Sequence, residues 1–158
     1  MSTSSLNTPQ RPPFKFEVKS YRKNIVIGCA DDEQVAPQEV VFDVVACVTP
    51  KAELLVDTWH PAFDYCVLTH AIDEACALLK LKILQEPLAY DVISRIFESH
   101  PLIEAVDLMV CKTQRYSGTD YIGFRLSLNR EQWEHLRTDV AQVQARIDGE
   151  AAAPGSQP

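Results

Sequence analysis

The chain lacks the residue patterns that most often mark a metal site. None of its five cysteines forms a Cys-x-x-Cys pair. Its four histidines are scattered, without the His-x-x-x-His or His-Glu-x-x-His spacing that brings two ligands onto one helix face. The sequence therefore predicts no metal. Because most of the cysteines fall within apolar segments, we expect buried, reduced thiols that pack as small hydrophobes.

Long apolar runs and an excess of positive charge are also missing. No apolar run approaches the roughly 20 residues that cross a bilayer. The first 13 residues are rich in Ser, Thr and Pro and do not have the pattern of a secretory signal. The net charge is −7, so no basic face is available to meet phosphates. We therefore expect a cytoplasmic protein that binds neither a membrane nor nucleic acid.

What the sequence does contain is typical of one soluble globular domain. Of its 158 residues, 46% are hydrophobic and 23% charged, which is enough apolar material for a substantial core. Composition predicts a flexible N-terminal lead over residues 1–13, a single domain over 14–148 and a flexible tail over 149–158.

Four segments have the patterns of β-strands. Residues 14–19 alternate apolar and polar side chains, and residues 24–28 continue this after a polar break at Arg22-Lys23. An acidic segment at 31–37 is expected to be a loop. Residues 38–48 are apolar on both faces, which predicts a central strand. Two further strands are predicted over 102–112 and 121–128, with a turn at 117–120.

Three segments have helical spacing. The first runs from Tyr65, with apolar residues three and four apart up to Ile83. The second begins at Glu86, with Pro87 at the first helical position, and stops at His100-Pro101. Asn129 is expected to cap the third, which runs to Ile147. The apolar positions of this last helix are Trp133, Leu136, Val140, Val143 and Ile147.

The resulting order of elements is β-β-α-α-β-β followed by a C-terminal helix. Two hairpins that flank a pair of helices predict an α+β fold, in which an antiparallel sheet carries both helices on one face. Such a sheet has two unpaired edges, and proteins usually cover these. We therefore expect an oligomer.

Two charged residues at the borders of apolar elements are candidates for chemistry. Glu86 is either a carboxylate that stabilises a helix N-terminus or a partly buried acid. In the second case it can accept two hydrogen bonds from the N–H and NH₂ edge of a guanine-like ring. Lys112 either extends from a strand end to solvent or is partly desolvated and acts as a general base. Local sequence does not decide between these alternatives.

Three further residues are weaker candidates. Tyr65 lies at the start of a helix and can equally be a core aromatic. Glu33, within the acidic segment, is expected from local sequence to be solvated, and Gln38 has no distinguishing feature by itself.

Taken together, the order and spacing of these residues resemble those of the dihydroneopterin aldolase family, which includes dihydroneopterin triphosphate epimerase. The resemblance covers roughly residues 14–128. It is carried by a glycine near the first strand, a glutamate five residues before a glutamine, an Asp-Tyr pair, a Leu-x-Glu-x-Leu-Ala motif and a strand that ends in lysine. Here these are Gly28, Glu33 with Gln38, Asp64-Tyr65, Leu84 to Ala89 and Lys112.

The resemblance implies a fold, a reaction and roles for residues. The family has the tunnelling fold, whose β-β-α-α-β-β subunits form barrels, here a tetramer or octamer with sites between subunits. Glu86 would hold the edge of a pterin, with the backbone of Gln85 beside it. Lys112 would be the main acid or base, Tyr65 would deliver protons, and Glu33 would bind the substrate's hydroxylated side chain. No cofactor is needed, because the pterin ring itself accepts the electrons.

The chain also departs from the family pattern. Thr113 follows Lys112 where many aldolases have proline, and the C-terminal helix is an addition. Three functions remain open: the aldolase, the epimerase with Arg22, Lys23 and Arg115 as candidates to bind a triphosphate, and a non-catalytic pterin- or purine-binding oligomer.

Overall fold

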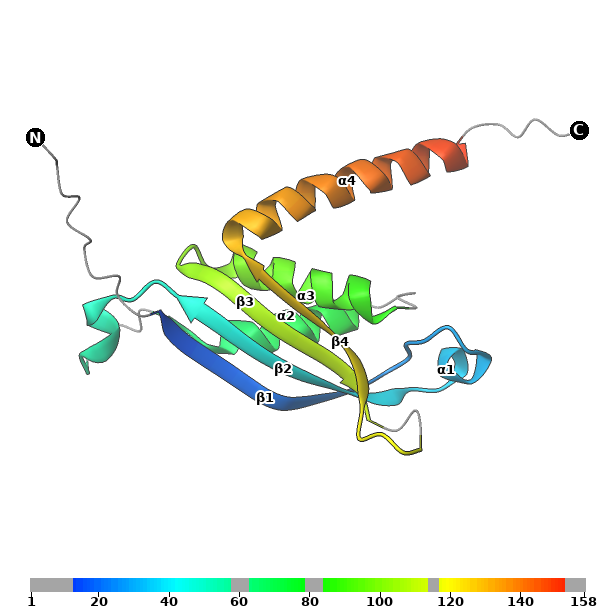
Figure 1. Ribbon diagram of the computed structural model, residues 1–158, viewed down its shortest axis with the longest axis horizontal. Coiled ribbons are helices and arrows are strands. Elements are labelled where there is room, and N and C mark those ends of the chain that lie inside the picture. Colours follow the sequence, from blue (N-terminus) through cyan, green and yellow to red (C-terminus); the bar gives the residue numbers. More distant parts are fainter. Residues whose placement is uncertain (1–12, 58–62, 79–83, 114–116, 153–158) are drawn as a thin grey trace, which may run out of the picture.

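The computed structural model describes residues 13–57, 63–78, 84–113 and 117–152 (Figure 1). Within these ranges the chain forms four strands, four α-helices and a short 3-10 helix. In chain order they are β1 (Phe14–Ile25), α1 (Asp31–Val35), β2 (Gln38–Val48), η1 (Ala52–Leu55), α2 (Cys66–Ala77), α3 (Gln85–Ser99), β3 (Ile103–Lys112), β4 (Ile122–Asn129) and α4 (Arg130–Ala152).

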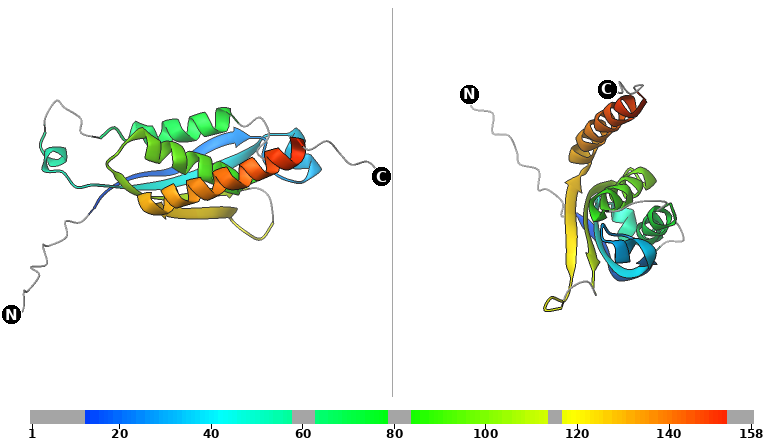
Figure 2. Two further views of the ribbon diagram at one scale, coloured as in Figure 1. Left: turned by 90° about the horizontal axis from the view of Figure 1, so that it is seen from above. Right: turned by 90° about the vertical axis from the view of Figure 1, so that its right-hand side faces the viewer.

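The four strands form one antiparallel sheet in the order β1-β2-β3-β4. Helices α2 and α3 lie on one face of this sheet, and α4 extends away from the end of β4 (Figure 2). The predicted α+β fold, with both helices on one face and an added C-terminal helix, is confirmed. Strands β1 and β4 are the two edges of the sheet.

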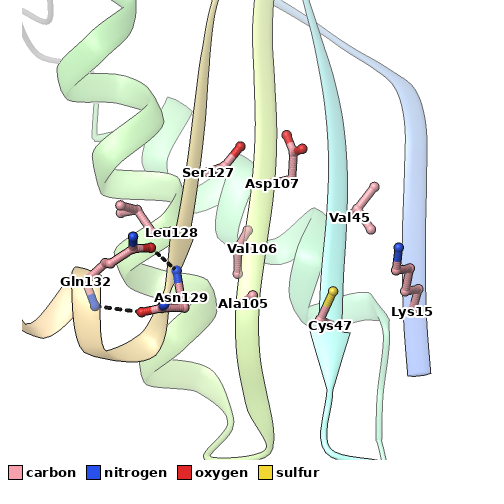
Figure 3. A pocket seen from close by; sticks show the side chains of 10 residues that line it. All are labelled: Lys15, Val45, Cys47, Ala105, Val106, Asp107, Ser127, Leu128, Asn129 and Gln132. Carbon is pink, nitrogen blue, oxygen red and sulfur yellow. Dashed lines mark hydrogen bonds between the residues drawn. The ribbon is translucent and has the colours of Figure 1, made fainter. Parts of the chain in front are cut away.

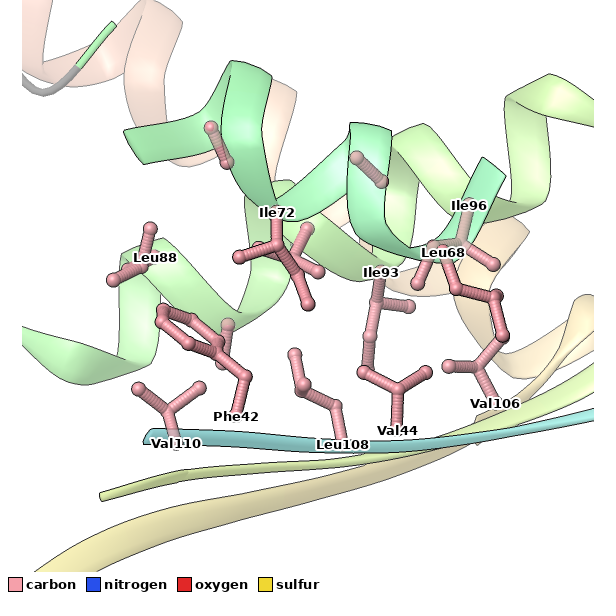
Figure 4. Close-up of a cluster of buried hydrophobic side chains, with 14 of the residues drawn as sticks. Phe42, Val44, Leu68, Ile72, Leu88, Ile93, Ile96, Val106, Leu108 and Val110 are labelled. Carbon is pink, nitrogen blue, oxygen red and sulfur yellow. The ribbon is translucent and has the colours of Figure 1, made fainter. Parts of the chain in front are cut away.

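The core lies between this sheet and its two helices. Alternate side chains of β2 and β3 point toward α2 and α3 and are almost fully buried (Figure 4). Each such side chain stabilises the fold by roughly 1.5–3 kcal/mol. The main contributors are Phe42, Val44, Leu68, Ile72, Leu88, Ile93, Ile96, Val106, Leu108 and Val110. Because Lys112 is in phase with Leu108 and Val110, its side chain leaves β3 on the helix-covered face.

The first strand is continuous, so the predicted break at Arg22-Lys23 is wrong. A β-bulge between Val18 and Tyr21 shifts the pairing with β2 by one residue. At the bulge Ser20 has φ +55°, and its N–H donates to Asp43 Oδ1 over 2.6 Å. The extra residue keeps apolar positions before and after the bulge on the same face, which explains why the alternation changes phase in the sequence.

Helix boundaries differ from the prediction in several places. Residues 31–35 form α1 rather than a loop. Helix α3 begins at Gln85, so Pro87 is its third residue, where a backbone N–H would still have no partner within the helix. Helix α2 ends at Ala77, and the remaining predicted helical positions, Leu79 and Ile83, lie outside the described residues.

The predicted cap of the last helix is confirmed. Asn129 Oδ1 accepts from the backbone N–H of Gln132 at 2.8 Å, and Gln132 Oε1 accepts from the N–H of Asn129 at 2.9 Å. This reciprocal pair satisfies two donors at the helix start. Helix α4 continues to Ala152, so residues 149–152, which composition assigns to the tail, are helical. The lead up to residue 12 and the tail from residue 153 lie outside the described residues.

In the described part of the chain, no helix combines the length and apolar character needed to cross a bilayer. The five cysteines are free thiols. Cys76 and Cys111 are buried, whereas Cys29 is exposed, so the expectation of buried thiols holds for only some of them.

Candidate functional site

A buried ion pair joins two of the predicted site residues. Lys112 Nζ lies 2.8 Å from Glu33 Oε1, and each residue is only 9% exposed. The two residues are 79 positions apart and come from α1 and the end of β3. The interpretation of Glu33 as a solvated residue is therefore wrong. Burial of a charged pair is costly unless both charges are well paired, so this pair is a departure from ordinary core packing.

The Glu33 carboxylate has further donors around it. Gln38 Nε2 lies 3.2 Å from Oε1, and the backbone N–H of Ala30 lies 3.3 Å from Oε2. The Gln38 amide also donates to the carbonyl of Ile27, which ties the start of β2 to the segment before α1. Gln38 therefore holds the carboxylate in place, a role that its local sequence did not reveal.

The backbone at Gly28 makes room for this carboxylate. Gly28 has φ +148°, a conformation that side chains with a Cβ rarely adopt. A Cβ at this position would lie 2.1 Å from the carboxyl carbon of Glu33. Only glycine allows the acid to pack directly against the chain here. In the sequence, the sole signal of this role is a glycine shortly before an acidic segment.

The same contacts set the protonation of Glu33. Burial alone would raise the pKa of its carboxyl group. The hydrogen bonds from Lys112, Gln38 and the Ala30 backbone outweigh this effect and lower the pKa to about 2. At neutral pH Glu33 is therefore a carboxylate in contact with the Lys112 side chain.

The predicted pterin-binding acid lies at the same end of the molecule. Helix α3 runs antiparallel to β3, because only the turn at residues 100–102 separates the end of α3 from the start of β3. The start of α3 therefore lies over the end of β3, and Leu88 and Val110 lie at the same end of the core, with Phe42 between them (Figure 4). Glu86, in the first turn of α3, is exposed, and the side chain of Gln85 is partly buried.

Tyr65 lies at the opposite end of the sheet. It immediately precedes α2, and its side chain is 62% exposed, so it is not the core aromatic that its spacing allowed. Phe63, two residues before it, contacts Phe16 near the start of β1 and His100 at the end of α3. Strand β3 has 10 residues, which span about 30 Å between the two ends. Tyr65 and Lys112 of one chain therefore do not share a site.

The predicted site residues divide into two groups. Glu33, Lys112, Gln85 and Glu86 gather at one end of the sheet, and Tyr65 lies at the other. An exposed tyrosine at one end and an acid–base pair at the other can meet only when two copies of the chain lie side by side. The paired charges can exchange protons with a bound substrate, and the exposed carboxylate can accept hydrogen bonds from a polar edge.

Thr113, which stands where many aldolases have proline, makes a contact that proline cannot make. Its hydroxyl donates to Glu39 Oε1 over 3.0 Å, and Arg22 Nη1 lies 2.6 Å from the same oxygen. Because side chains alternate along a strand, Thr113 and Glu39 lie on the face of the sheet opposite to that of Lys112 and its partner Val40.

A separate hollow lies on that open face of the sheet (Figure 3). It has a volume of about 380 Å³ and is lined by residues of all four strands and by Gln132. None of the predicted site residues borders it, so it is distinct from the Glu33–Lys112 pair. Among the described residues, no group of three or more His, Cys, Asp or Glu side chains is arranged to hold a metal ion.

An antiparallel four-stranded sheet with two helices on one face defines the chain as an α+β protein. A model of the dihydroneopterin aldolase family, FolB, matches residues 16–127. The chain belongs to this family.

Solved structures agree on the fold. A dihydroneopterin aldolase from Burkholderia thailendensis bound to guanine superposes with a TM-score of 0.62 at 20% identity, over 75% of this chain and 92% of that chain. The E. coli dihydroneopterin aldolase in complex with neopterin gives a TM-score of 0.64 at 15% identity, over 73% of this chain and 99% of that one. No curated protein sequence matches the chain significantly.

Proposed function

We propose that the protein is a lyase of folate biosynthesis that cleaves 7,8-dihydroneopterin into 6-hydroxymethyl-7,8-dihydropterin and glycolaldehyde. The observation that supports this most is the buried Glu33–Lys112 pair, at the sheet end where α3 begins with Glu86, in a chain of the dihydroneopterin aldolase family.

Recognition of the substrate would depend on Glu86. Its carboxylate would accept hydrogen bonds from N3–H and the 2-amino group of the pterin, and the backbone of Gln85 would lie beside the ring. Guanine and neopterin, which are bound in two related structures, both carry this edge. The exposed position of Glu86 leaves its two oxygens accessible to such a ligand.

The reaction needs only proton transfers. A base removes the proton of the 2′-hydroxyl group, and that oxygen becomes the carbonyl of glycolaldehyde as the C1′–C2′ bond breaks. The electrons of this bond pass into the N5=C6 imine of the ring and form an enamine. An acid then protonates C1′, which leaves the hydroxymethyl product. No water or cofactor is consumed.

Lys112 would be the acid or base of this sequence, directly or through a water molecule, and Glu33 would hold its ammonium group in position. Glu33 would also bind the hydroxyl groups of the substrate's side chain. Tyr65 would reach the substrate from a neighbouring subunit, in a tetramer or octamer, and would assist proton delivery. The cytoplasmic location expected from the sequence stays a prediction.

The direct test is incubation of the purified protein with 7,8-dihydroneopterin and separation of the products by chromatography. We expect glycolaldehyde and 6-hydroxymethyl-7,8-dihydropterin in equal amounts. Lys112→Met should lower kcat by roughly 10²–10⁴-fold, whereas the exposed Lys19→Met should have no effect. If wild-type protein releases neither glycolaldehyde nor the 2′-epimer, the proposal is wrong.

The same assay separates the alternatives. Recapture of the aldehyde on its other face gives the 2′-epimer, so an epimerase would accumulate this product instead of glycolaldehyde. Two of the cations considered for a triphosphate are engaged elsewhere, because Arg22 pairs with Glu39 at 2.6 Å and Lys23 pairs with Asp73 at 2.9 Å. Arg115 lies outside the described residues. Tight binding of pterin without turnover would indicate the non-catalytic alternative.

A further inference from the structure

Helix α4 lies outside the part of the chain that the family model covers. The family model ends at residue 127, whereas α4 spans Arg130–Ala152. Helix α4 is attached to the body of the molecule over its first part, up to Arg137, whose Nη1 lies 4.0 Å from Glu98 Oε1 of α3. Trp133 is 3% exposed and stacks on Phe97 with ring centroids 5.1 Å apart, and its indole N–H donates to Ser94 over 3.0 Å. Further along, the helix extends away from the sheet (Figure 2).

An apolar stripe continues from Trp133 along the outer part of the helix. Leu136, Val140, Val143 and Ile147 follow at spacings of four, three and four residues, which is the a/d pattern of a coiled coil. The last three are 40%, 46% and 50% exposed. Exposed apolar side chains in an a/d pattern indicate a helix surface that packs against another helix.

The charges that flank the stripe show which helix fits. Asp139 and Arg146 occupy equivalent positions on the same side of the stripe, one heptad apart. In an antiparallel pair of identical helices, these positions meet across the interface, so Asp139 of each copy would face Arg146 of the other. In the same register Val140 packs against Val143 of the second copy, and Leu136 packs against Ile147. The surface is therefore complementary to itself, as a two-fold interface requires.

A parallel pair lacks this complementarity. There Asp139 would face Gln144 of the second copy, and Arg146 would face Ala151, so neither charge would find an opposite one. We propose that α4 is an assembly element that pairs antiparallel with α4 of a second copy of this chain over residues 136–147.

The paired segment is short, about 18 Å of helix. A contact of this length is weak when it acts alone, but several such contacts act together when copies are already joined. Because α4 leaves the sheet at its end, its pairing is compatible with an assembly through the sheet edges and would double the number of chains in it. The inference does not depend on the aldolase activity.

The test is the molar mass of the full-length protein by light scattering and sedimentation velocity across a range of concentrations. We expect the double variant Val140→Glu with Val143→Glu to have half the mass of the wild type. A matched control, Thr138→Glu with Gln142→Glu, adds the same charge to other faces of α4 and should keep the wild-type mass. Equal masses for the wild type and the Val140/Val143 variant would overturn the proposal.

Charge exchange tests the orientation. Asp139→Arg or Arg146→Asp alone places like charges opposite each other and should shift the assembly toward the half-mass species. The combined exchange restores two opposite pairs and should restore the wild-type mass. If the single variants keep the wild-type mass, the antiparallel pairing is wrong. Turnover per subunit should be the same in all these variants, because α4 carries no predicted site residue. Failure of the aldolase proposal would therefore be seen separately from failure of this one.

Discussion

At the scale of single residues, the acid of the buried pair makes stability depend on pH. The carboxyl of Glu33 titrates near pH 4.5 in the unfolded chain and at about 2 in the folded one. Between these values the unfolded state binds more protons, so stability rises with pH over this range. The contribution is complete above about pH 5.5 and is lost as the pH falls toward 2.

Glu33→Gln removes this titration but keeps the size of the side chain. We expect wild type to be more stable than the variant at pH 7, and this difference to shrink by up to about 3 kcal/mol as the pH falls to 2. Urea unfolding of both proteins at fixed protein concentration, repeated from pH 7 down to pH 2.5, measures it. A difference that stays constant over this range would contradict the assignment of the low pKa to Glu33.

Substitution of Gly28 tests whether the Glu33 carboxylate needs the space that the missing Cβ leaves. Gly28→Ala would force a Cβ to within 2.1 Å of the Glu33 carboxyl at a backbone conformation with φ +148°. We expect a loss of stability of about 1–3 kcal/mol from the backbone alone and a larger loss of activity, because Glu33 must move away from Lys112. Urea unfolding and the aldolase assay measure the two effects.

Gly149→Ala is the matched control, since Gly149 lies in α4 with nothing within 4 Å of an added Cβ. It should stabilise the helix slightly, by up to about 1 kcal/mol, and leave turnover unchanged. If both alanine variants behaved alike, the special role of Gly28 would be refuted.

Substitution of Glu86 should weaken the binding of guanine and of dihydropterins. Glu86→Gln replaces a charged acceptor pair by an amide that offers one acceptor, so affinity for guanine and for dihydropterins should fall by roughly 10–100-fold. Titration calorimetry with guanine measures this without turnover. Glu131→Gln alters an acid in the first turn of another helix, α4, and should leave affinity unchanged. Equal affinities of the wild type and Glu86→Gln would mean that Glu86 only stabilises the start of α3.

At the scale of elements, the attachment of α4 depends mainly on the aromatic side chain of Trp133 and on Arg130. Trp133 packs on Phe97, and Arg130 donates to the carbonyls of Phe97, His100 and Ile103, which lie at the end of α3 and the start of β3. The contacts with Phe97 and His100 provide donors to carbonyl groups at the end of α3, where the helix itself offers none.

Trp133→Ala should therefore destabilise the protein by about 3–5 kcal/mol, because it leaves a cavity beside Phe97. Trp133→Phe keeps most of the stacking but loses the hydrogen bond to Ser94, so it should cost about 1–2 kcal/mol. Thermal unfolding, monitored by circular dichroism, ranks the wild type and the two variants by stability. Unfolding that is unchanged in Trp133→Ala would mean that α4 is not anchored through this residue.

Local sequence predicted the elements whose pattern is long and regular. The strand over residues 38–48 and the cap at Asn129 are found as expected, because alternation and capping are local properties. The five-residue helix α1 was missed, since it is too short to show a helical period. The sequence pattern predicts a break in β1 where the structure has a continuous strand with a bulge, because an extra residue inverts the alternation without ending the strand.

The site was harder to predict than the fold, because its main contact joins residues that are far apart in the sequence. Nothing near Glu33 indicates that Lys112, 79 residues later, lies against it. The resemblance to a family selected both residues, but their direct ion pair and the support from Gln38 and Gly28 are visible only in three dimensions. The separation of Tyr65 from the other residues likewise follows from the direction of the helices and not from any local pattern.

At the scale of the whole molecule, this separation leads to a test of assembly. If the site is formed by Lys112 of one subunit and Tyr65 of its neighbour, two inactive variants can restore each other. Lys112→Met keeps a functional tyrosine, and Tyr65→Phe keeps a functional lysine. In a randomly mixed oligomer, about one quarter of the interfaces would combine the two intact residues in a heterologous contact.

We therefore expect that unfolding both variants together and refolding them as a 1:1 mixture restores about one quarter of the wild-type activity per site, whereas each variant refolded alone stays inactive. Mixing the folded proteins without refolding controls for exchange of subunits. The aldolase assay provides the readout, and light scattering verifies that the mixture has the same mass as the wild type. A mixed oligomer of normal mass without recovered activity would mean that Tyr65 and Lys112 do not meet across a subunit boundary. Because the two side chains lie at opposite ends of one sheet, the effect of Tyr65→Phe on activity would then be indirect.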